Sequence, residues 1–294
     1  MKMIEYLDRY NLSNLSAQEE IFSPEDINPI LKLYFIPKEE NIIDKISINS
    51  IVGIYDNVKS QSLSDLLMVY YQDGDPYDYF SRANGLLDYS PSELRKILDS
   101  GLQSGSINVR QMEKNKYFIY SNGIHRFLML KLAYLHEQRK GNTNELLEKY
   151  KIPVTATKCD FIKSYCYFLL SRYSQVEIDR IKNPESGRVE TSMGKVRNPS
   201  DKEVVDSVMN NVDLNNDDFI YLMKKVPSFN GFMQILNPKL KDRCDSLVIS
   251  DDELNTRVDT ILNPKKQEFD DSADSVKLPS YVDAFSFFGN PMKK

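Results

Sequence analysis

The middle of the chain constrains the fold most, because its hydrophobic pattern changes from the period of a strand to that of a helix within a few residues. Residues 107–110 and 117–120 are short runs rich in β-forming side chains, and residues 113–116 between them are polar. Two such runs around a polar turn predict a β-hairpin. A glycine turn at Gly123 then leads into an apolar-rich run of helical spacing, Ile124–Gln138. The sequence therefore predicts a hairpin that feeds directly into a helix.

Further elements are predicted on both sides of this unit. Residues 152–157 follow the helix and predict another strand, so that strands and helix can close a small mixed sheet. Residues 90–93 (Ser-Pro-Ser-Glu) have the N-cap serine, early proline and acidic residue of a helix start, and similar starts occur at Ser23, Ser200 and Ser250. We therefore expect an α+β fold: a small mixed-sheet domain flanked by mainly helical N- and C-terminal regions.

Composition and the positions of Gly, Pro and polar runs along the chain predict five regions. We expect an acidic, mainly helical region at 1–87, the mixed-sheet domain at 88–180, a basic linker at 181–199, a helical region at 200–264, and a loose tail at 265–294. The tail ends in an aromatic cluster, which could dock on a protein partner or pack back onto its own domain.

The composition excludes several classes of protein. A chain of 294 residues with 41% hydrophobic content can bury a sizeable core. The opening residues 1–6 show no apolar h-region, and no run approaches roughly 18 apolar residues, so we expect a soluble cytoplasmic protein with no membrane partner. Three cysteines without a C-x-x-C pair, and only two histidines, predict neither a disulfide framework nor a metal site.

Charge is distributed unevenly along the sequence. Residues 1–100 hold 9 Lys/Arg and 17 Asp/Glu, residues 101–200 hold 17 and 9, and residues 201–294 hold 12 and 17, which gives balances of −8, +8 and −5. A basic middle third indicates an anionic partner, either a nucleotide or a nucleic acid. The alternative is compensation by the acidic flanks of the same chain.

The turn from strand to helix carries the chemistry that would bind such an anion. The first amides of a helix lack intrahelical partners, and the helix dipole adds partial positive charge there. Gly123 permits a tight turn and a close approach of a ligand to the backbone, and Arg126 offers a planar fork for phosphate oxygens. His125, in the same first turn, can donate a hydrogen bond or move a proton near neutral pH. The alternative is an ordinary hairpin turn followed by a surface histidine.

The run Tyr-Phe-Ile-Tyr-Ser-Asn-Gly-Ile-His-Arg at 117–126 resembles the signature turn of the ParB/sulfiredoxin superfamily, in which a strand ends in a glycine turn and His-Arg or Arg-Arg opens the next helix. The order of the surrounding elements is similar over about residues 88–165. The resemblance implies a nucleotide-binding domain with ATP or CTP as ligand, with or without Mg²⁺. Ile124 stands where sulfiredoxin has its reactive cysteine, so the resemblance does not extend to reductase chemistry.

The resemblance and the residues together give two functional hypotheses. The first is a nucleotide-binding protein, an NTPase or kinase-like phosphotransferase, in which the turn residues hold phosphate and His125 acts as the catalytic group. These residues are Asn122, Gly123, Ile124, His125 and Arg126. The second is a non-enzymatic regulator of ParB type that binds DNA, RNA or a protein partner.

The sequence does not identify a general base for the first hypothesis. Asp99, Glu113 and Asp160 are candidates by proximity along the chain, although carboxylates of this kind are usually solvated. Lys131 and Arg110 could widen the positive field, with surface solvation as the default expectation for both.

Overall fold

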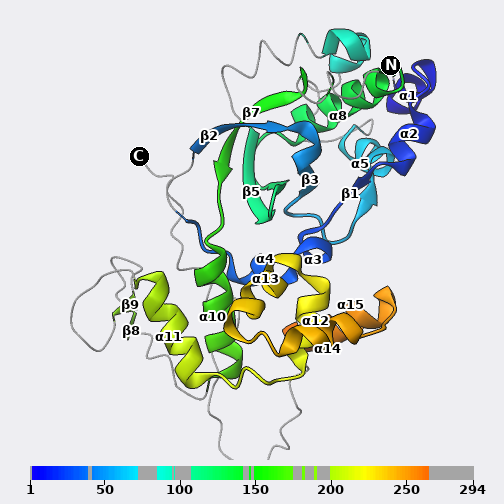
Figure 1. Ribbon diagram of the computed structural model, residues 1–294. Coiled ribbons are helices and arrows are strands. Elements are labelled where there is room, and N and C mark those ends of the chain that lie inside the picture. The colour runs from blue at the N-terminus through cyan, green and yellow to red at the C-terminus, as the bar shows by residue number, and fades with distance from the viewer. Residues whose placement is uncertain are drawn as a thin grey trace, which may run out of the picture. The chain divides into compact units, whose positions relative to one another are not determined.

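A mixed sheet of five strands, in the order β2–β7–β5–β6–β3, lies within residues 42–157 of the computed structural model (Figure 1). The strands are β2 (Ile42–Ser47), β3 (Ile51–Ile54), β5 (Ile107–Glu113), β6 (Lys116–Ile119) and β7 (Lys151–Thr157). β2 pairs antiparallel with β7, β7 parallel with β5, β5 antiparallel with β6, and β6 parallel with β3. The α+β class predicted from the sequence is therefore confirmed.

The structure describes residues 2–38, 42–71, 85–94, 96, 107–141, 146, 149–174, 181–182, 189–190 and 199–264. The chain divides into two units. The first comprises Met1–Tyr165 and Met223–Phe232, and the second Cys166–Leu222 and Met233–Lys294.

The predicted hairpin is formed by β5 and β6. Ile107 and Val109 are fully buried, whereas Asn108 and Arg110 between them are half-buried, as the alternating faces of a strand require. Asn115 completes the turn with a φ of 60°, a conformation that asparagine tolerates better than most residues. β5 continues to Glu113, so the strand is longer than the sequence indicated.

The two edge strands, β2 and β3, come from the N-terminal region, where the sequence analysis expected helices. They are consecutive along the chain and are joined by the short 3-10 helix η1 (Ile48–Ser50). Because these strands pair with β7 and β6, residues from both sides of the expected boundary at 87/88 share one sheet and one unit. This division differs from the five regions expected from the sequence.

Helix α8 has the bounds that the sequence predicted, Ile124–Gln138. Its N-cap is Gly123, and Phe127 through Leu135 are all buried. It contacts β5, η1, α2 (Ser13–Gln18) and α5 (Leu63–Tyr70) (Figure 1). After the helix, Gly141 has a φ of 99°, which is the left-handed conformation common just beyond helix ends.

The remaining elements of the first unit are mostly short helices. They are α1 (Met3–Arg9), β1 (Glu20–Ile21), α3 (Pro24–Ile27), α4 (Pro29–Tyr34), β4 (Gln61–Ser62) and η2 (Gly85–Asp88). The capping boxes predicted at Ser90 and Ser200 are present, and Ser23 and Ser250 also cap helices. The helix starts predicted from serine and acidic residues are therefore confirmed.

The second unit is mainly helical over its described residues. It contains β8 (Ile181–Lys182), β9 (Val189–Glu190), α11 (Asp201–Asn211), α14 (Leu240–Ser246) and α15 (Asp251–Leu262), and the boundary between the units falls within α10 (Phe161–Tyr173), α12 (Asp218–Lys225) and α13 (Pro227–Leu236). The expected tail at 265–294 and most of the expected linker at 181–199 lie outside the described residues. Within the described ranges, no helix has both the length and the apolar character that crossing a membrane requires.

Candidate phosphate-binding site at the first turn of helix α8

The turn before α8 is built on Gly123, whose φ of 103° lies in the left-handed region. A Cβ at this position would lie 2.7 Å from Cγ1 of Ile107 and 3.0 Å from its Cα. The neighbouring Asn122 accepts a hydrogen bond through its carbonyl oxygen from the Asn108 amide, at 3.0 Å. The turn is thus pressed against the first residues of β5, and only glycine fits without strain.

The first turn of α8 presents backbone amides at the end of the sheet where β6 terminates. The amide of Phe127 donates to the carbonyl of Gly123 at 2.9 Å, so the amides of Ile124, His125 and Arg126 precede the first α-helical hydrogen bond. The N-cap glycine has no side chain to accept from them, in contrast to Ser200 of α11, whose hydroxyl caps that helix. The amides and the helix dipole make this end of α8 suitable for an anion.

His125 lies between two tyrosine rings at the end of α5. Its ring is 5.5 Å from that of Tyr70 and 5.6 Å from that of Tyr71, centroid to centroid, with edge-to-face geometry in both cases. Burial lowers the pKa of His125. The imidazole is therefore mainly neutral at pH 7, where it can donate or accept a hydrogen bond, and Arg126 is the cation of the first turn.

The lowered pKa of His125 can be measured directly, because the chain has only two histidines. We expect the His125 ring protons to titrate by NMR with a midpoint below 6.5, with His125→Gln identifying the signal. Since unfolded histidine titrates near 6.5, the unfolded state binds more protons between that value and the lower folded pKa. Stability should therefore fall as the pH drops through this window. The pKa of His136 is also lowered, chiefly by burial. A His125 midpoint at or above 6.5 would contradict this prediction.

Two buried polar groups lie in the segments next to the turn. Tyr71 is 5% exposed, and its hydroxyl has no hydrogen-bond partner among the described residues. Asn57 is 9% exposed, and its side-chain Nδ2 likewise lacks a partner within the described ranges. Asn57 follows β3, which runs parallel to β6, so it lies at the same end of the sheet as the turn. Unpaired buried groups cost free energy, and a ligand that paired with them would recover it.

Asp56 is an exposed carboxylate at this end of the sheet whose charge acts on groups on both sides of it. Burial raises the pKa of Tyr70, and Asp56 raises it further. Burial lowers the pKa of Lys32, and Asp56 opposes that shift. The groups that the charge of Asp56 reaches therefore extend from Tyr70, beside His125, to Lys32 of α4.

Arg110 is not a solvated surface residue, as the default expectation had it, but half-buried among aromatic rings. Its guanidinium carbon lies 4.5 Å from the ring centroid of Tyr120, 5.0 Å from that of Tyr55 and 5.3 Å from that of Phe35. A guanidinium at these distances gains cation–π attraction from each ring. Sequence reasoning missed this group because the three rings come from distant segments of the chain.

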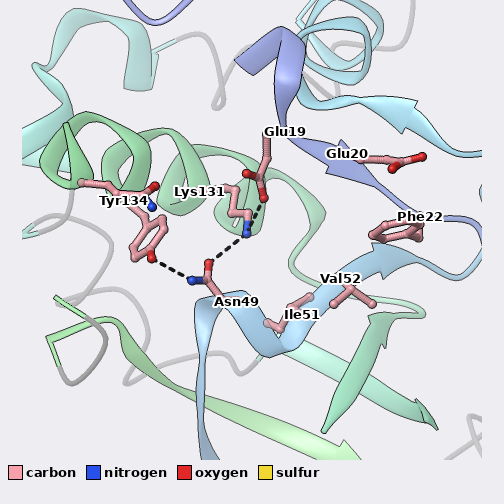
Figure 2. A pocket seen from close by; sticks show the side chains of 9 residues that line it. Glu19, Glu20, Phe22, Asn49, Ile51, Val52, Lys131 and Tyr134 are labelled. Carbon is pink, nitrogen blue, oxygen red and sulfur yellow. Dashed lines mark hydrogen bonds and ion pairs between the residues drawn. The ribbon is translucent and has the colours of Figure 1, made fainter. Parts of the chain in front are cut away.

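Lys131 is buried, so the expectation of surface solvation was wrong here too. Figure 2 shows its side chain pointing from α8 into a cleft of about 250 Å³, which Glu20, Phe22 and Gln138 also line. Its Nζ lies 2.7 Å from Oε1 of Glu19 and donates to Oδ1 of Asn49 at 3.0 Å. Asn49 in turn donates to the Tyr134 hydroxyl at 2.7 Å. The charge of Lys131 is therefore neutralised within the cleft and is not available to the first turn of α8.

The carboxylates considered as general bases lie elsewhere. Glu113 is buried at the far end of β5 from Gly123 and accepts hydrogen bonds from the hydroxyl and amide of Ser228, at 2.7 and 3.3 Å. Asp160 follows the end of β7 that is also remote from the turn, and it caps α10 by accepting from the Lys163 amide at 3.0 Å. Both are buried rather than solvated, and both act in structure. Asp99 lies outside the described residues.

Among the residues that the structure describes, no group of three or more His, Cys, Asp or Glu side chains could hold a metal ion. Comparisons of the chain with models of protein families, with curated protein sequences and with solved structures gave no match.

Proposed function

We propose that this protein binds a nucleotide through its phosphates at the first turn of α8. The observation that carries the proposal is the turn itself: a left-handed glycine pressed against Ile107 opens a helix of 15 residues, and no side chain caps that helix at its N-cap. The resemblance of residues 117–126 to the ParB/sulfiredoxin turn supports the same ligand class. ATP or CTP, with or without Mg²⁺, is the nucleotide we propose.

Each residue of the turn has a proposed role that follows from its chemistry. The amides of Ile124 and His125 would donate to one phosphate, and the Arg126 fork would bind it by two hydrogen bonds. The side chain of neutral His125 would donate one further hydrogen bond. Asn122 and Gly123 shape the turn, and Asn57 and Tyr71 offer polar atoms at its side that have no hydrogen-bond partner among the described residues. Binding, rather than transfer, is the core of the proposal, because no carboxylate among the described candidates lies where a general base would act.

A phosphotransferase or NTPase reaction remains an extension of this proposal. Phosphoryl transfer requires positioning and charge neutralisation more than covalent participation by protein groups. His125, with its lowered pKa, is the residue we propose to move a proton in such a reaction. We also propose a cytoplasmic location, because the sequence has an odd number of cysteines and no C-x-x-C pair.

Arg126→Ala is expected to weaken nucleotide binding by about 1.5–3 kcal/mol, the range for hydrogen bonds to a charged group. Isothermal titration calorimetry with ATP and CTP, each with and without Mg²⁺, measures this change. Arg139→Ala is the matched control: Arg139 is exposed at the other end of α8, and its side chain donates to the Asn11 carbonyl at 3.3 Å. The control should bind as the wild type does.

Thermal unfolding separates a binding role of Arg126 from a structural one. An Arg126→Ala variant that unfolds at the wild-type temperature and loses affinity supports the proposal. A variant that keeps its affinity, or a wild-type protein that none of the nucleotides binds or stabilises, refutes it. Ligand at about a hundred times its dissociation constant should stabilise by roughly 2.7 kcal/mol, which thermal shift detects readily.

A further inference from the structure

Arg110 is a charged residue near the proposed site that the roles described above do not use. It projects from β5 on the strand face opposite to Ile107 and Val109, which are buried. Three aromatic rings surround its guanidinium, at 4.5, 5.0 and 5.3 Å. The rings fix the orientation of the planar group before any ligand arrives.

The guanidinium has no negatively charged partner among the described residues. None of the ion pairs found there includes Arg110. Its side chain hydrogen-bonds Tyr55, whereas its Nε is buried without a hydrogen-bond acceptor among the described residues. Burying a cation without an anion costs free energy. Cation–π contacts offset only part of that cost. An oxyanion supplied by a ligand would complete the site.

Arg110 also lies next to the strand that leads to the turn of α8. The ring closest to it belongs to Tyr120, which precedes Gly123 by three residues and whose amide donates to the Asn108 carbonyl at 3.2 Å. A second ring belongs to Tyr55, which directly precedes Asp56. The charge of Asp56 raises the pKa of Tyr70, whose ring contacts that of His125. The guanidinium, on the opposite strand face, and the first turn of α8 therefore both lie near the end of the sheet at which β3 and β6 terminate.

We propose that Arg110 binds a second anionic group of the same ligand whose first phosphate lies at the turn of α8. This inference rests on the proposed function and narrows its ligand class to molecules with at least two phosphates. Such a molecule is either a nucleoside di- or triphosphate or an oligonucleotide. Arg110 would then distinguish these ligands from a nucleoside monophosphate.

The test compares AMP, ADP and ATP, and a short oligothymidylate, with the wild type and three variants. Arg110→Gln removes the charge, Arg110→Lys keeps the charge without the planar fork, and Arg126→Ala removes the first phosphate contact. We expect Arg110→Gln to weaken ADP and ATP binding about tenfold, as the loss of one charged hydrogen bond does, while AMP binding stays within about twofold. The affinity of Arg110→Lys for ADP and ATP should lie between that of the wild type and that of Arg110→Gln. AMP binding also reports whether the two Arg110 variants are folded.

The outcomes separate this inference from the function on which it rests. A loss confined to ADP and ATP supports it with a nucleotide as ligand, and a loss confined to the oligothymidylate supports it with a nucleic acid as ligand. Equal losses for AMP, ADP and ATP, or no loss for any ligand, overturn it even when Arg126→Ala weakens all of them. If Arg126→Ala changes none of the affinities, the proposed phosphate site at α8 fails. A phosphate-dependent effect of Arg110→Gln would then indicate a phosphate contact at Arg110 that does not involve the turn of α8.

Discussion

Gly123→Ala is expected to lower the free energy of unfolding by about 2–5 kcal/mol. The left-handed backbone costs an alanine roughly 1–2 kcal/mol. The added Cβ would also lie 2.7 Å from Cγ1 of Ile107 and 3.0 Å from its Cα, and overpacking of this kind costs about 1–3 kcal/mol. The backbone of β5 is one of the colliding groups, so the turn cannot relieve the contact by rotating a side chain.

Gly141→Ala is the matched control for this substitution. Gly141 has nearly the same φ, 99°, but a Cβ there would meet none of the described residues within 4 Å. Its loss should be about 1–2 kcal/mol, from backbone strain alone. Urea unfolding of both variants measures the difference, which is the steric contribution of the turn. If the two variants lose the same stability, the close packing of the turn against Ile107 is wrong.

The parts of the fold that the sequence predicted well are those set by local chemistry. The bounds of α8 follow from a glycine turn at one end and a helical run of apolar residues, and the hairpin follows from two β-forming runs around Asn115. Helix starts at Ser90 and Ser200 follow from capping residues three positions apart. Each of these signals lies within a few residues of the structure that it specifies.

The features that the sequence analysis missed depend on partners distant in the chain. β2 is an edge strand whose residues are largely exposed, so it lacks the strict alternation that marks a half-buried strand. A signal was nevertheless present, because residues 42–54 contain six isoleucines and a valine, which favour strands. The acceptors of Lys131 and the rings around Arg110 lie too far along the chain for spacing to reveal them.

Glu19→Ala is expected to lower the free energy of unfolding by about 2–4 kcal/mol, because it leaves the buried ammonium of Lys131 without its carboxylate. The Lys131 side chain is 5% exposed and that of Glu19 is 28% exposed. Breaking a fully buried pair costs about 3–5 kcal/mol, and the partial exposure of Glu19 reduces that value. The neighbouring Glu20 lines the same cleft (Figure 2) but is exposed. Glu20→Ala, the control, should change stability by less than about 0.5 kcal/mol.

A second substitution tests whether the loss of stability comes from the buried ammonium of Lys131 that has lost its carboxylate. In the Glu19→Ala background, Lys131→Met replaces the ammonium with an apolar side chain of similar length, so most of the lost stability should return. Urea unfolding of the two single variants and the double variant gives the coupling between the residues. Additive losses would show that Lys131 carries no buried charge that depends on Glu19. Lys131 lies about two turns after Ile124, the first residue of α8, and its charge is paired within the cleft. At a temperature where Glu19→Ala stays folded, its nucleotide affinity should therefore match that of the wild type.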